Sequence, residues 1–546
     1  MNRQIRGLHE AAYLLASFTF LSQVLALVRD RVFAHSFGAG GVLDAYFAAF
    51  RIPDLAFALL TLFISSFALV PLIAARGGAK SNEARELIGS VLFAFGIVAL
   101  VLSALLYTLI PVFVPALFPG FSAEVAADVI LLSRIMLFQP VLLGISSIAA
   151  SVMQSSQKFV LYALAPIFYN VGIITGAVFL YPAFGVAGLA WGVVLGAAFH
   201  LTVQTWPALA HDRALSPRRP HAVFADVRRV VTLSLPRALA LSAHQVLLLV
   251  FLGAASLSTL GSVAALSFGW NLQSVPLSVI GASYATALFP ALAALYTRGE
   301  RELFIGEVWS AIRHTMFWIM PAIMLMVVLR AHIVRVILGS GAFSWNDTRL
   351  TAAILAAFVV SLIAQGALLI FSRAYYAAGR SLEPIAVNVL SAALAGVTAY
   401  LGVIWFQNAT LTRYFLEDLF RIGGISGTET VMVAIAYSSV MLVAAGIFAV
   451  LFARRFGFEQ RTLHSLLFSF SASIIGSAAA YGALQLFGPL LPTDTFVGIL
   501  TQGFVAGVVG LAAWVATLWL LKSRDFREVV TIMHRLVMQR SSANTK

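Results

Sequence analysis

Long apolar segments dominate the chain and restrict it to one class of fold. A helix that spans a membrane needs about 20 consecutive, mostly apolar residues, and about fourteen segments of this sequence reach that length. With 61% hydrophobic residues, 10% charged residues and a mean hydropathy of +0.95, the 546-residue chain has too little polar surface to cover a water-soluble globule. The sequence therefore predicts an all-α, polytopic membrane protein.

The apolar segments also predict how the chain is divided. Helices are expected at residues 8–30, 43–75, 86–115, 125–153, 158–181, 184–208, 228–254, 258–295, 303–330, 349–378, 383–406, 429–453, 463–487 and 495–521. We expect two six-helix lobes followed by two C-terminal helices. The expected parts are an N-lobe (1–210), a basic, polar, Pro-containing cytoplasmic linker (211–229), a C-lobe (230–456), the last two helices (457–522) and a basic amphipathic cytoplasmic tail (523–546).

Two segments point to an internal repeat. ALVPLIAA at Ala68–Ala75 and ALFPALAA at Ala287–Ala294 are identical at five of eight positions, and each follows an earlier proline, Pro53 or Pro276. Both belong to even-numbered predicted helices, so they run in the same direction through the membrane. This favours a parallel repeat about an axis normal to the membrane; chance similarity between Ala-rich and Leu-rich segments is the alternative.

The basic residues indicate how the chain is oriented. The chain has 35 Lys and Arg residues and a formal net charge of +13. If the N-terminus is cytoplasmic, most of these residues fall in inner connections, whereas the outer connections PALFPGFSA and FGPLLPTD carry none. Cytoplasmic loops are enriched in Lys and Arg, so both termini are expected in the cytoplasm. Because the basic residues are spread over many short loops, we expect contact with membrane lipids rather than with nucleic acid.

One stretch of the apolar sequence is rich in charge. Residues 22–54 read SQVLALVRDRVFAHSFGAGGVLDAYFAAFRIPD and contain Arg29, Asp30, Asp44, Arg51 and Asp54. Charged groups in hydrocarbon cost several kcal/mol unless they pair or face water, so such a cluster indicates a functional site. Asp44 and Arg51 are seven residues, or two helical turns, apart and share a helix face. An anion-binding lining is one interpretation; snorkelling arginines and structural ion pairs are the other.

Arg134, Arg237 and Arg313, the last with Glu307, are the other ionisable residues in or near predicted helices. Arg134 is well inside the fourth helix and is the better candidate for a cavity. Arg237 is within about two turns of the inner side, where a long side chain reaches water.

The sequence lacks the motifs of several enzyme classes. It has no cysteine, and it contains no HExxH, P-loop or GxSxG motif. We therefore expect a transporter without metal or cofactor, driven by an ion gradient, the membrane potential or the gradient of its cargo. A polyprenyl-dependent membrane glycosyltransferase, with Asp30 and Asp44 as base or metal ligands, stays open as an alternative, although loop carboxylates are scarce.

The charged stretch resembles a family signature. SQVLALVRDRVFAHSFGAGGVLDAYFAAFRIPDL is similar to the helix 1 to helix 2 signature of the MurJ/MviN family of lipid II flippases, in the multidrug/oligosaccharidyl-lipid/polysaccharide exporter (MOP) superfamily. Weaker similarity follows in ALVPLIAA, ALAPIFYNVGII, GLAWGVVLG, GAF and SRAYYAAGRSLEP. The resemblance implies fourteen helices around a central cavity that opens alternately inward and outward. It also implies a cargo of undecaprenyl-pyrophosphate-linked peptidoglycan precursor.

The resemblance assigns roles to individual residues and also shows departures. Arg29 matches the arginine of the family's R-D pair, Asp44 its acidic helix 2 residue and Arg51 its basic residue before the proline. Two expected arginines are replaced by Gln23 and Asn271. A further arginine is missing within residues 55–57, and the aspartate and lysine of D-x-K-T-P are missing from residues 379–384. The chain is thus similar to a divergent member that lacks several cavity arginines.

These observations lead to one expected function. We expect a bacterial inner-membrane flippase that moves a lipid-linked cell-wall precursor from the inner to the outer leaflet by alternating access and works as a monomer. The substrate contacts are expected to be Arg29, Asp30, Asp44, Arg51, Arg134, Gln23 and Asn271. An exporter of the same superfamily for another polyprenyl-linked or amphipathic cargo is the main alternative.

Overall fold

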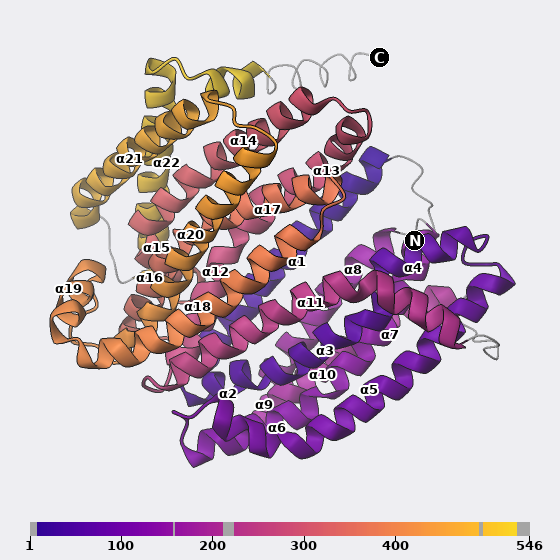
Figure 1. Cartoon of the computed structure of the whole chain (residues 1–546). Coiled ribbons are helices and arrows are strands. Elements are labelled where there is room, and N and C mark those ends of the chain that lie inside the picture. The colour runs from indigo at the N-terminus through magenta and orange to yellow at the C-terminus, as the bar shows by residue number, and fades with distance from the viewer. Residues whose placement is uncertain (1–7, 157–158, 211–222, 491–494, 532–546) are drawn as a thin grey trace, which may run out of the picture.

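The chain folds into a bundle of long helices (Figure 1). The computed structural model describes residues 8–156, 159–210, 223–490 and 495–531, and the regular structure within these ranges is entirely helical. The first part contains α1 (Leu8–Phe37), α2 (Gly41–Ala49), α3 (Arg51–Ile64), α4 (Ser66–Ala75), α5 (Asn82–Leu117), α6 (Ala123–Met136), α7 (Phe138–Ser155), α8 (Phe159–Thr175), η1 (Gly176–Leu180), α9 (Tyr181–Phe184) and α10 (Val186–Ala210).

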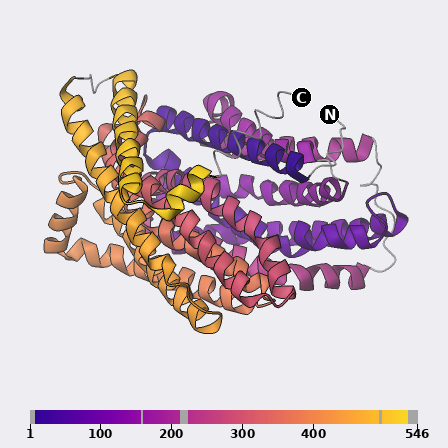
Figure 2. The same cartoon turned by 90° about the horizontal axis from the view of Figure 1, so that it is seen from above.

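The second part has the same character. It contains α11 (Val223–Ser256), α12 (Ser262–Pro276), η2 (Leu277–Gly281), α13 (Ala282–Thr297), α14 (Arg301–Val328), α15 (Arg330–Ile337), α16 (Trp345–Val359), α17 (Ser361–Ala377), α18 (Leu382–Asn408), α19 (Thr410–Phe420), η3 (Thr428–Thr430), α20 (Val431–Arg455), α21 (Arg461–Phe487), η4 (Gly488–Leu490) and α22 (Phe496–Leu520). Figure 2 shows α21 and α22 side by side at one end of the molecule, against α14.

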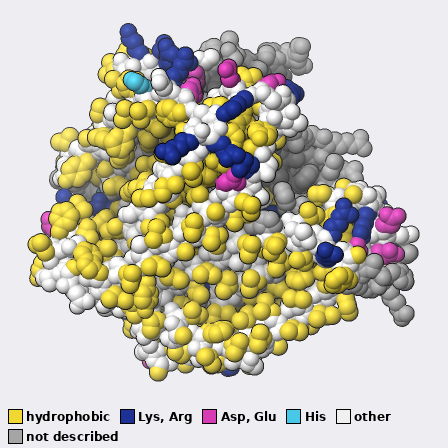
Figure 3. All heavy atoms as spheres, in the orientation of Figure 1, with side chains coloured by type: hydrophobic (Ala, Val, Ile, Leu, Met, Phe, Trp, Pro, Cys, Tyr) yellow, Lys and Arg dark blue, Asp and Glu magenta, His cyan; other side chains and the backbone are white. Residues whose placement is uncertain are grey.

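The predicted membrane helices agree with the observed ones to within a few residues. Among the described residues, 13 helical stretches are long and apolar enough to cross a membrane. The 30-residue α1 is a further long helix outside that set, and corresponds to the first predicted span. Apolar side chains cover the broad face of the molecule seen in Figure 3, while Lys and Arg gather towards its margins. The polytopic all-α fold is therefore confirmed; the division into two lobes stays a prediction.

The predicted linker and tail differ in part from the structure. α11 begins at Val223, so the last residues of the predicted linker are the first two turns of a long helix, and residues 211–222 lie outside the described ranges. Residues 524–531 of the tail are helical. Phe526 and Val529 pack against Phe317 and Trp514 rather than facing lipid alone, because α14 and α22 offer an apolar surface there. The rest of the tail lies outside the described residues.

Prolines break two of the predicted helices. A proline ring has no N–H and clashes with the carbonyl of residue i−4. α2 ends at Ala49, four residues before Pro53, and α6 ends at Met136, four residues before Pro140. The carbonyl of Ala49 instead accepts a hydrogen bond from Ser133 Oγ at 3.1 Å, so it is not left unpaired.

Glycines allow α8 and its continuation η1 to pack closely against α10. A Cβ on Gly192 would lie 2.4 Å from Cα of Gly176, and one on Gly172 would lie 2.3 Å from Cα of Gly196. Small residues at every fourth position bring helix backbones together in membranes. These four glycines therefore fix the distance between two helices that border the central part of the bundle.

Candidate functional site

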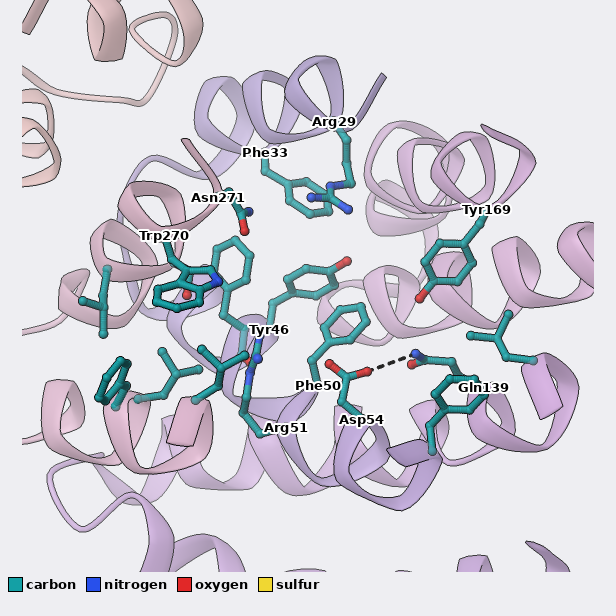
Figure 4. A pocket seen from close by; sticks show the side chains of 18 of the residues that line it. Arg29, Phe33, Tyr46, Phe50, Arg51, Asp54, Gln139, Tyr169, Trp270 and Asn271 are labelled. Atoms are coloured by element: carbon teal, nitrogen blue, oxygen red, sulfur yellow. Dashed lines mark hydrogen bonds between the residues drawn. The ribbon is translucent and has the colours of Figure 1, made fainter. Parts of the chain in front are cut away.

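A cavity of about 370 Å³ lies where the charged stretch meets the middle of the bundle (Figure 4). It is lined by side chains from α1, α2, α3, α7, α8, α11, α12 and α16. The lining residues are Arg29, Phe33, Tyr46, Phe47, Phe50, Arg51, Asp54, Phe57, Gln139, Leu143, Tyr169, Leu248, Phe251, Leu252, Leu266, Ser267, Trp270, Asn271 and Phe358. We call it the central cavity.

The proline breaks bring polar side chains to the cavity wall. Arg51 and Asp54 flank Pro53 at the start of α3, and Gln139 precedes Pro140 at the start of α7. In Figure 4, Asp54 and Gln139 face each other, with Gln139 Nε2 donating to Asp54 Oδ1 at 3.3 Å. The proline breaks that end α2 and α6 therefore place Arg51, Asp54 and Gln139 around the central cavity.

Arg29 is held by a small hydrogen-bond network. Its Nε and Nη2 donate to Asp30 Oδ1 at 3.0 and 2.8 Å, and its Nη1 donates to Asn170 Oδ1 at 3.2 Å. Asn271 Nδ2 donates to the second carboxylate oxygen of Asp30 at 2.9 Å. Asp30 is buried behind Arg29 and joins α1 to α12, so its role is to orient the arginine rather than to face the cavity.

Arg51 is the less engaged of the two cavity arginines. Its Nε donates to the carbonyl of Phe47 at 3.4 Å, and it forms no ion pair with a described acidic residue. Figure 4 shows Arg51 and Arg29 reaching into the cavity from different helices. An anion that enters the cavity meets Arg51 without first displacing a carboxylate.

The central cavity is close to electrically neutral and strongly aromatic. Asp30 and Asp54 balance Arg29 and Arg51, and nearly half of the lining side chains are aromatic. Asn271 supplies an amide where the family resemblance implies a cation. The cavity can thus bind one anionic group through its arginines and pack apolar faces of a cargo against rings.

Asp44 lies outside the cavity and closes one end of the bundle. Its carboxylate accepts hydrogen bonds from the backbone N–H of Gly261 at 2.6 Å and of Ala264 at 2.8 Å, and the residue is 1% exposed. No side chain of α12 itself caps this helix. An acceptor with negative charge is favourable at a helix N-terminus, so Asp44 from α2 caps α12 across 217 residues of sequence.

Neighbouring connections close the same end. We call it the outer end, following the predicted orientation. Ala342 N donates to the carbonyl of His35 at 2.9 Å, and Arg31 Nη1 donates to the carbonyls of Val336 and Ile337 at 2.5 and 3.2 Å. A Cβ on Gly38 would lie 2.6 Å from the carbonyl oxygen of Ala342, so the two loops are in close contact. α1 and α2 are thereby joined to α12 and to the segment before α16.

Two expected site residues lie elsewhere. Arg134 does not line the central cavity, because its guanidinium stacks over the ring of Tyr107, with Cζ 4.5 Å from the ring centroid, and its Nε donates to the carbonyl of that residue. Gln23 lies two turns before Arg29 on α1 and lines a second cavity. Sequence reasoning did not single out Gln139 or Asn170; their only signal was an uncharged polar side chain inside an apolar segment.

The opposite, inner end carries an ion pair. Arg76, just after α4, forms a bidentate pair with Asp226 in the first turn of α11. The hydrogen bond from Arg76 to Asp226 raises the pKa of the guanidinium above its usual value. The pair attaches the start of α11 to the end of α4.

One group of side chains has the spacing of a metal site. His314, Asp525 and Glu528 have ligand atoms within 4.8 Å of one another. Arg313 Nε lies 3.7 Å from Asp525, and Ser465 Oγ donates to the same carboxylate. Because Arg313 pairs with both Glu459 and Asp525, these residues form an ion-pair network between α14, α21 and residues 524–531.

Comparison with known proteins places the chain in a family. A family model described as "Lipid II flippase MurJ" matches residues 33–500, most of the chain. The chain belongs to the MurJ family of lipid II flippases. It is 24% identical over 419 residues to "Lipid II flippase MurJ" of Burkholderia cenocepacia, covering 74% of this chain and 80% of that protein. It is 26% identical over 475 residues to "Probable lipid II flippase MurJ" of Thermotoga maritima, covering 81% and 95%.

Solved structures support the same fold. The chain is similar to "Lipid II flippase MurJ, inward closed conformation" with a TM-score of 0.73 at 21% identity, covering 95% of this chain and 100% of that one. It is also similar to an inward-facing MATE family transporter of the MOP superfamily, with a TM-score of 0.63 at 18% identity, covering 80% and 94%. The MurJ family is a family of multi-pass membrane transporters.

Proposed function

We propose that this protein is a lipid II flippase that moves its lipid-linked cell-wall precursor from the inner to the outer leaflet by alternating access. The observation that carries the proposal is a cavity in which Arg29 and Arg51, both matched to the family signature, face a space bordered by helices from both halves of the sequence. Guanidinium groups bind phosphate oxygens through charge-assisted hydrogen bonds. A lipid-linked pyrophosphate is a cargo of that chemistry.

The arrangement of the two ends supports alternating access. The outer end is closed by the cap of Asp44 on α12 and by the contacts of Arg31 and Ala342. Apolar side chains, such as Phe47 and Phe343 on either side of Phe268, also pack there, so an outward-opening motion has to separate this packing as well as break the hydrogen bonds. Discrete contacts of this kind are typical of the gates of bistable transporters.

Membrane placement and energetics complete the proposal. We place both termini in the cytoplasm of a bacterial inner membrane, supported by the positive-inside pattern of the loops. The protein functions as a monomer, without nucleic acid, cofactor or catalysis. Transport is driven by the membrane potential, an ion gradient or the gradient of the precursor.

A second candidate is export of another polyprenyl-linked or amphipathic cargo. It is favoured by the charge balance of an aromatic cavity, in which Asp54 in the lining and Asp30 behind Arg29 offset the two arginines, since the family resemblance implies a more positive cavity. Losing charge-assisted contacts to a pyrophosphate, each worth about 1.5 to 3 kcal/mol, weakens binding of such a group.

The test is translocation of lipid II in proteoliposomes that contain the purified protein. Arg29→Gln and Arg51→Gln should each abolish or strongly reduce translocation, because each removes a cavity guanidinium. Arg373→Gln, whose guanidinium lies over the ring of Phe289 away from the cavity, serves as the control. Wild-type protein that moves no lipid II but moves another polyprenyl-linked sugar would select the second candidate, and full activity of both cavity variants would discard the anion-contact role.

A further inference from the structure

A second cavity of about 430 Å³ lies beside the first, within the part of the bundle formed by α1, α3, α4, α7, α8, α10 and α11. Phe57 is the residue that lines both cavities. Polar side chains from four of these helices and from Ser65, between α3 and α4, line the second cavity: Gln23, Ser65, Ser147, His200, Gln204 and Arg237. We call it the inner cavity.

The two cavities are stacked along the helix axes. On α1, Gln23 of the inner cavity lies six residues before Arg29, which is about 9 Å at 1.5 Å per residue. The same order holds on α11, where Arg237 precedes Leu248, and in the opposite chain direction on α7, where Ser147 follows Gln139. The inner cavity is thus consistently nearer the end where α1 begins.

Buried polar groups in the inner cavity lack partners. Gln204 is 1% exposed, and its Oε1 accepts no hydrogen bond from any described group. Ser65 is 6% exposed, and its Oγ is likewise unpaired among the described residues. Buried polar atoms are nearly always hydrogen-bonded, so two unpaired groups that line one cavity indicate a polar ligand.

A cation also lines this cavity. Arg237 is an exposed residue of α11 and has no hydrogen bond or ion pair with a described residue. His200 Nδ1 lies 2.7 Å from Ser146 Oγ, which fixes the imidazole. Amide, hydroxyl and imidazole groups together with one guanidinium match a ligand with many hydroxyls and one anionic group, which is the chemistry of a sugar phosphate.

We propose that the inner cavity is a loading site for the sugar phosphate of the lipid-linked cargo, occupied before the anion reaches Arg51. The proposal rests on the proposed function and adds a second site to it. Gln204 and Ser65 bind sugar hydroxyls, and Arg237 binds a phosphate oxygen. Movement of the Phe57 ring connects this site to the central cavity.

The experiment measures binding of lipid II to the full chain in phosphatidylcholine nanodiscs, by native mass spectrometry. The double variant Gln204→Leu/Arg237→Gln should lower the affinity about ten-fold or more, because it removes one charge-assisted and one neutral hydrogen bond. The matched control is Thr202→Val/Arg229→Gln, which alters exposed residues of the same two helices outside both cavities and should stay within about two-fold of wild type. Ser65→Ala gives an independent variant if the double one folds poorly.

The outcomes separate this proposal from the flippase assignment. Unchanged affinity of the double variant and of Ser65→Ala, with wild-type protein that binds and moves lipid II, would overturn the loading site alone. If wild type binds no lipid II but binds N-acetylglucosamine 1-phosphate, and the double variant loses that binding, the site stands and the cargo assignment falls. Equal binding of phosphatidylglycerol and lipid II would show a site for bulk lipid head groups and would overturn the proposal.

Discussion

The cap that Asp44 places on α12 should decide how often the outer end opens. Asp44→Ala removes two buried charge-assisted hydrogen bonds, to the N–H groups of Gly261 and Ala264. At about 1.5 to 3 kcal/mol each, the loss is about 3 to 6 kcal/mol. Burial of the carboxylate at 1% exposure means that solvent does not screen these bonds in the closed state.

The direction of the effect follows from comparing the closed and the open outer end. In an open outer end, water contacts both the carboxylate and the two N–H groups, so the substitution mainly destabilises the closed state. A change of about 3 to 6 kcal/mol alters the ratio of closed to open protein by about a hundred-fold to ten-thousand-fold. Asp44→Asn keeps one uncharged acceptor oxygen and should give a smaller shift in the same direction.

The assay is a distance measurement between spin labels across the outer end. The chain has no cysteine, so Glu124→Cys on α6 and Asn346→Cys on α16, both exposed positions, can be labelled without background. The Asp44→Ala protein should show a new population at longer distance. Asp418→Ala removes an exposed carboxylate of α19 and is the control. A distance distribution in Asp44→Ala that matches wild type would refute the assignment of this contact as a gate.

Two further predictions concern packing and the inner end. Gly192→Val should lower the thermal unfolding temperature, because its side chain would meet Gly176 and overpacking costs about 1 to 3 kcal/mol; Gly446→Val, with open space around it, is the control in the same fluorimetric assay. Asp226→Asn should destabilise the protein by about 1 kcal/mol or less, and by less still at high salt, because the pair with Arg76 is partly exposed. A salt-independent loss in urea titrations would contradict the electrostatic account.

The helices were predictable because their signal is local. An apolar run of sufficient length specifies a membrane helix whatever its neighbours are, and 86–115 for α5 or 463–487 for α21 is correct to within four residues. The breaks at Ala49 and Met136 follow from a rule that acts over four residues. The sequence therefore contains the information for both breaks, at Pro53 and at Pro140.

The site was predictable only where its residues are close in sequence. Arg29 and Arg51 lie in one signature stretch and meet in one cavity. The partners of Asp44 are 217 and 220 residues away, so no local pattern distinguishes a helix cap from a cavity lining. The placement of Arg134 failed for a related reason, since depth in the membrane does not say which neighbour a helix face meets.

A modest number of cations in each cavity has a functional advantage for a carrier of anions. A pyrophosphate bound by several arginines in one place would bind tightly and dissociate slowly. Transport requires sites whose affinity is high enough to bind the anion and low enough to release it. Here Arg237 lies in the inner cavity and Arg29 and Arg51 lie in the central one, with Asp30 and Asp54 reducing the net charge around them. Among the described residues neither cavity is lined by more than two guanidinium groups, so under the proposed mechanism an anion would exchange one contact for the next as it moves. Under the same mechanism, Gln23 and Asn271 in place of arginines would shift the balance from affinity towards release.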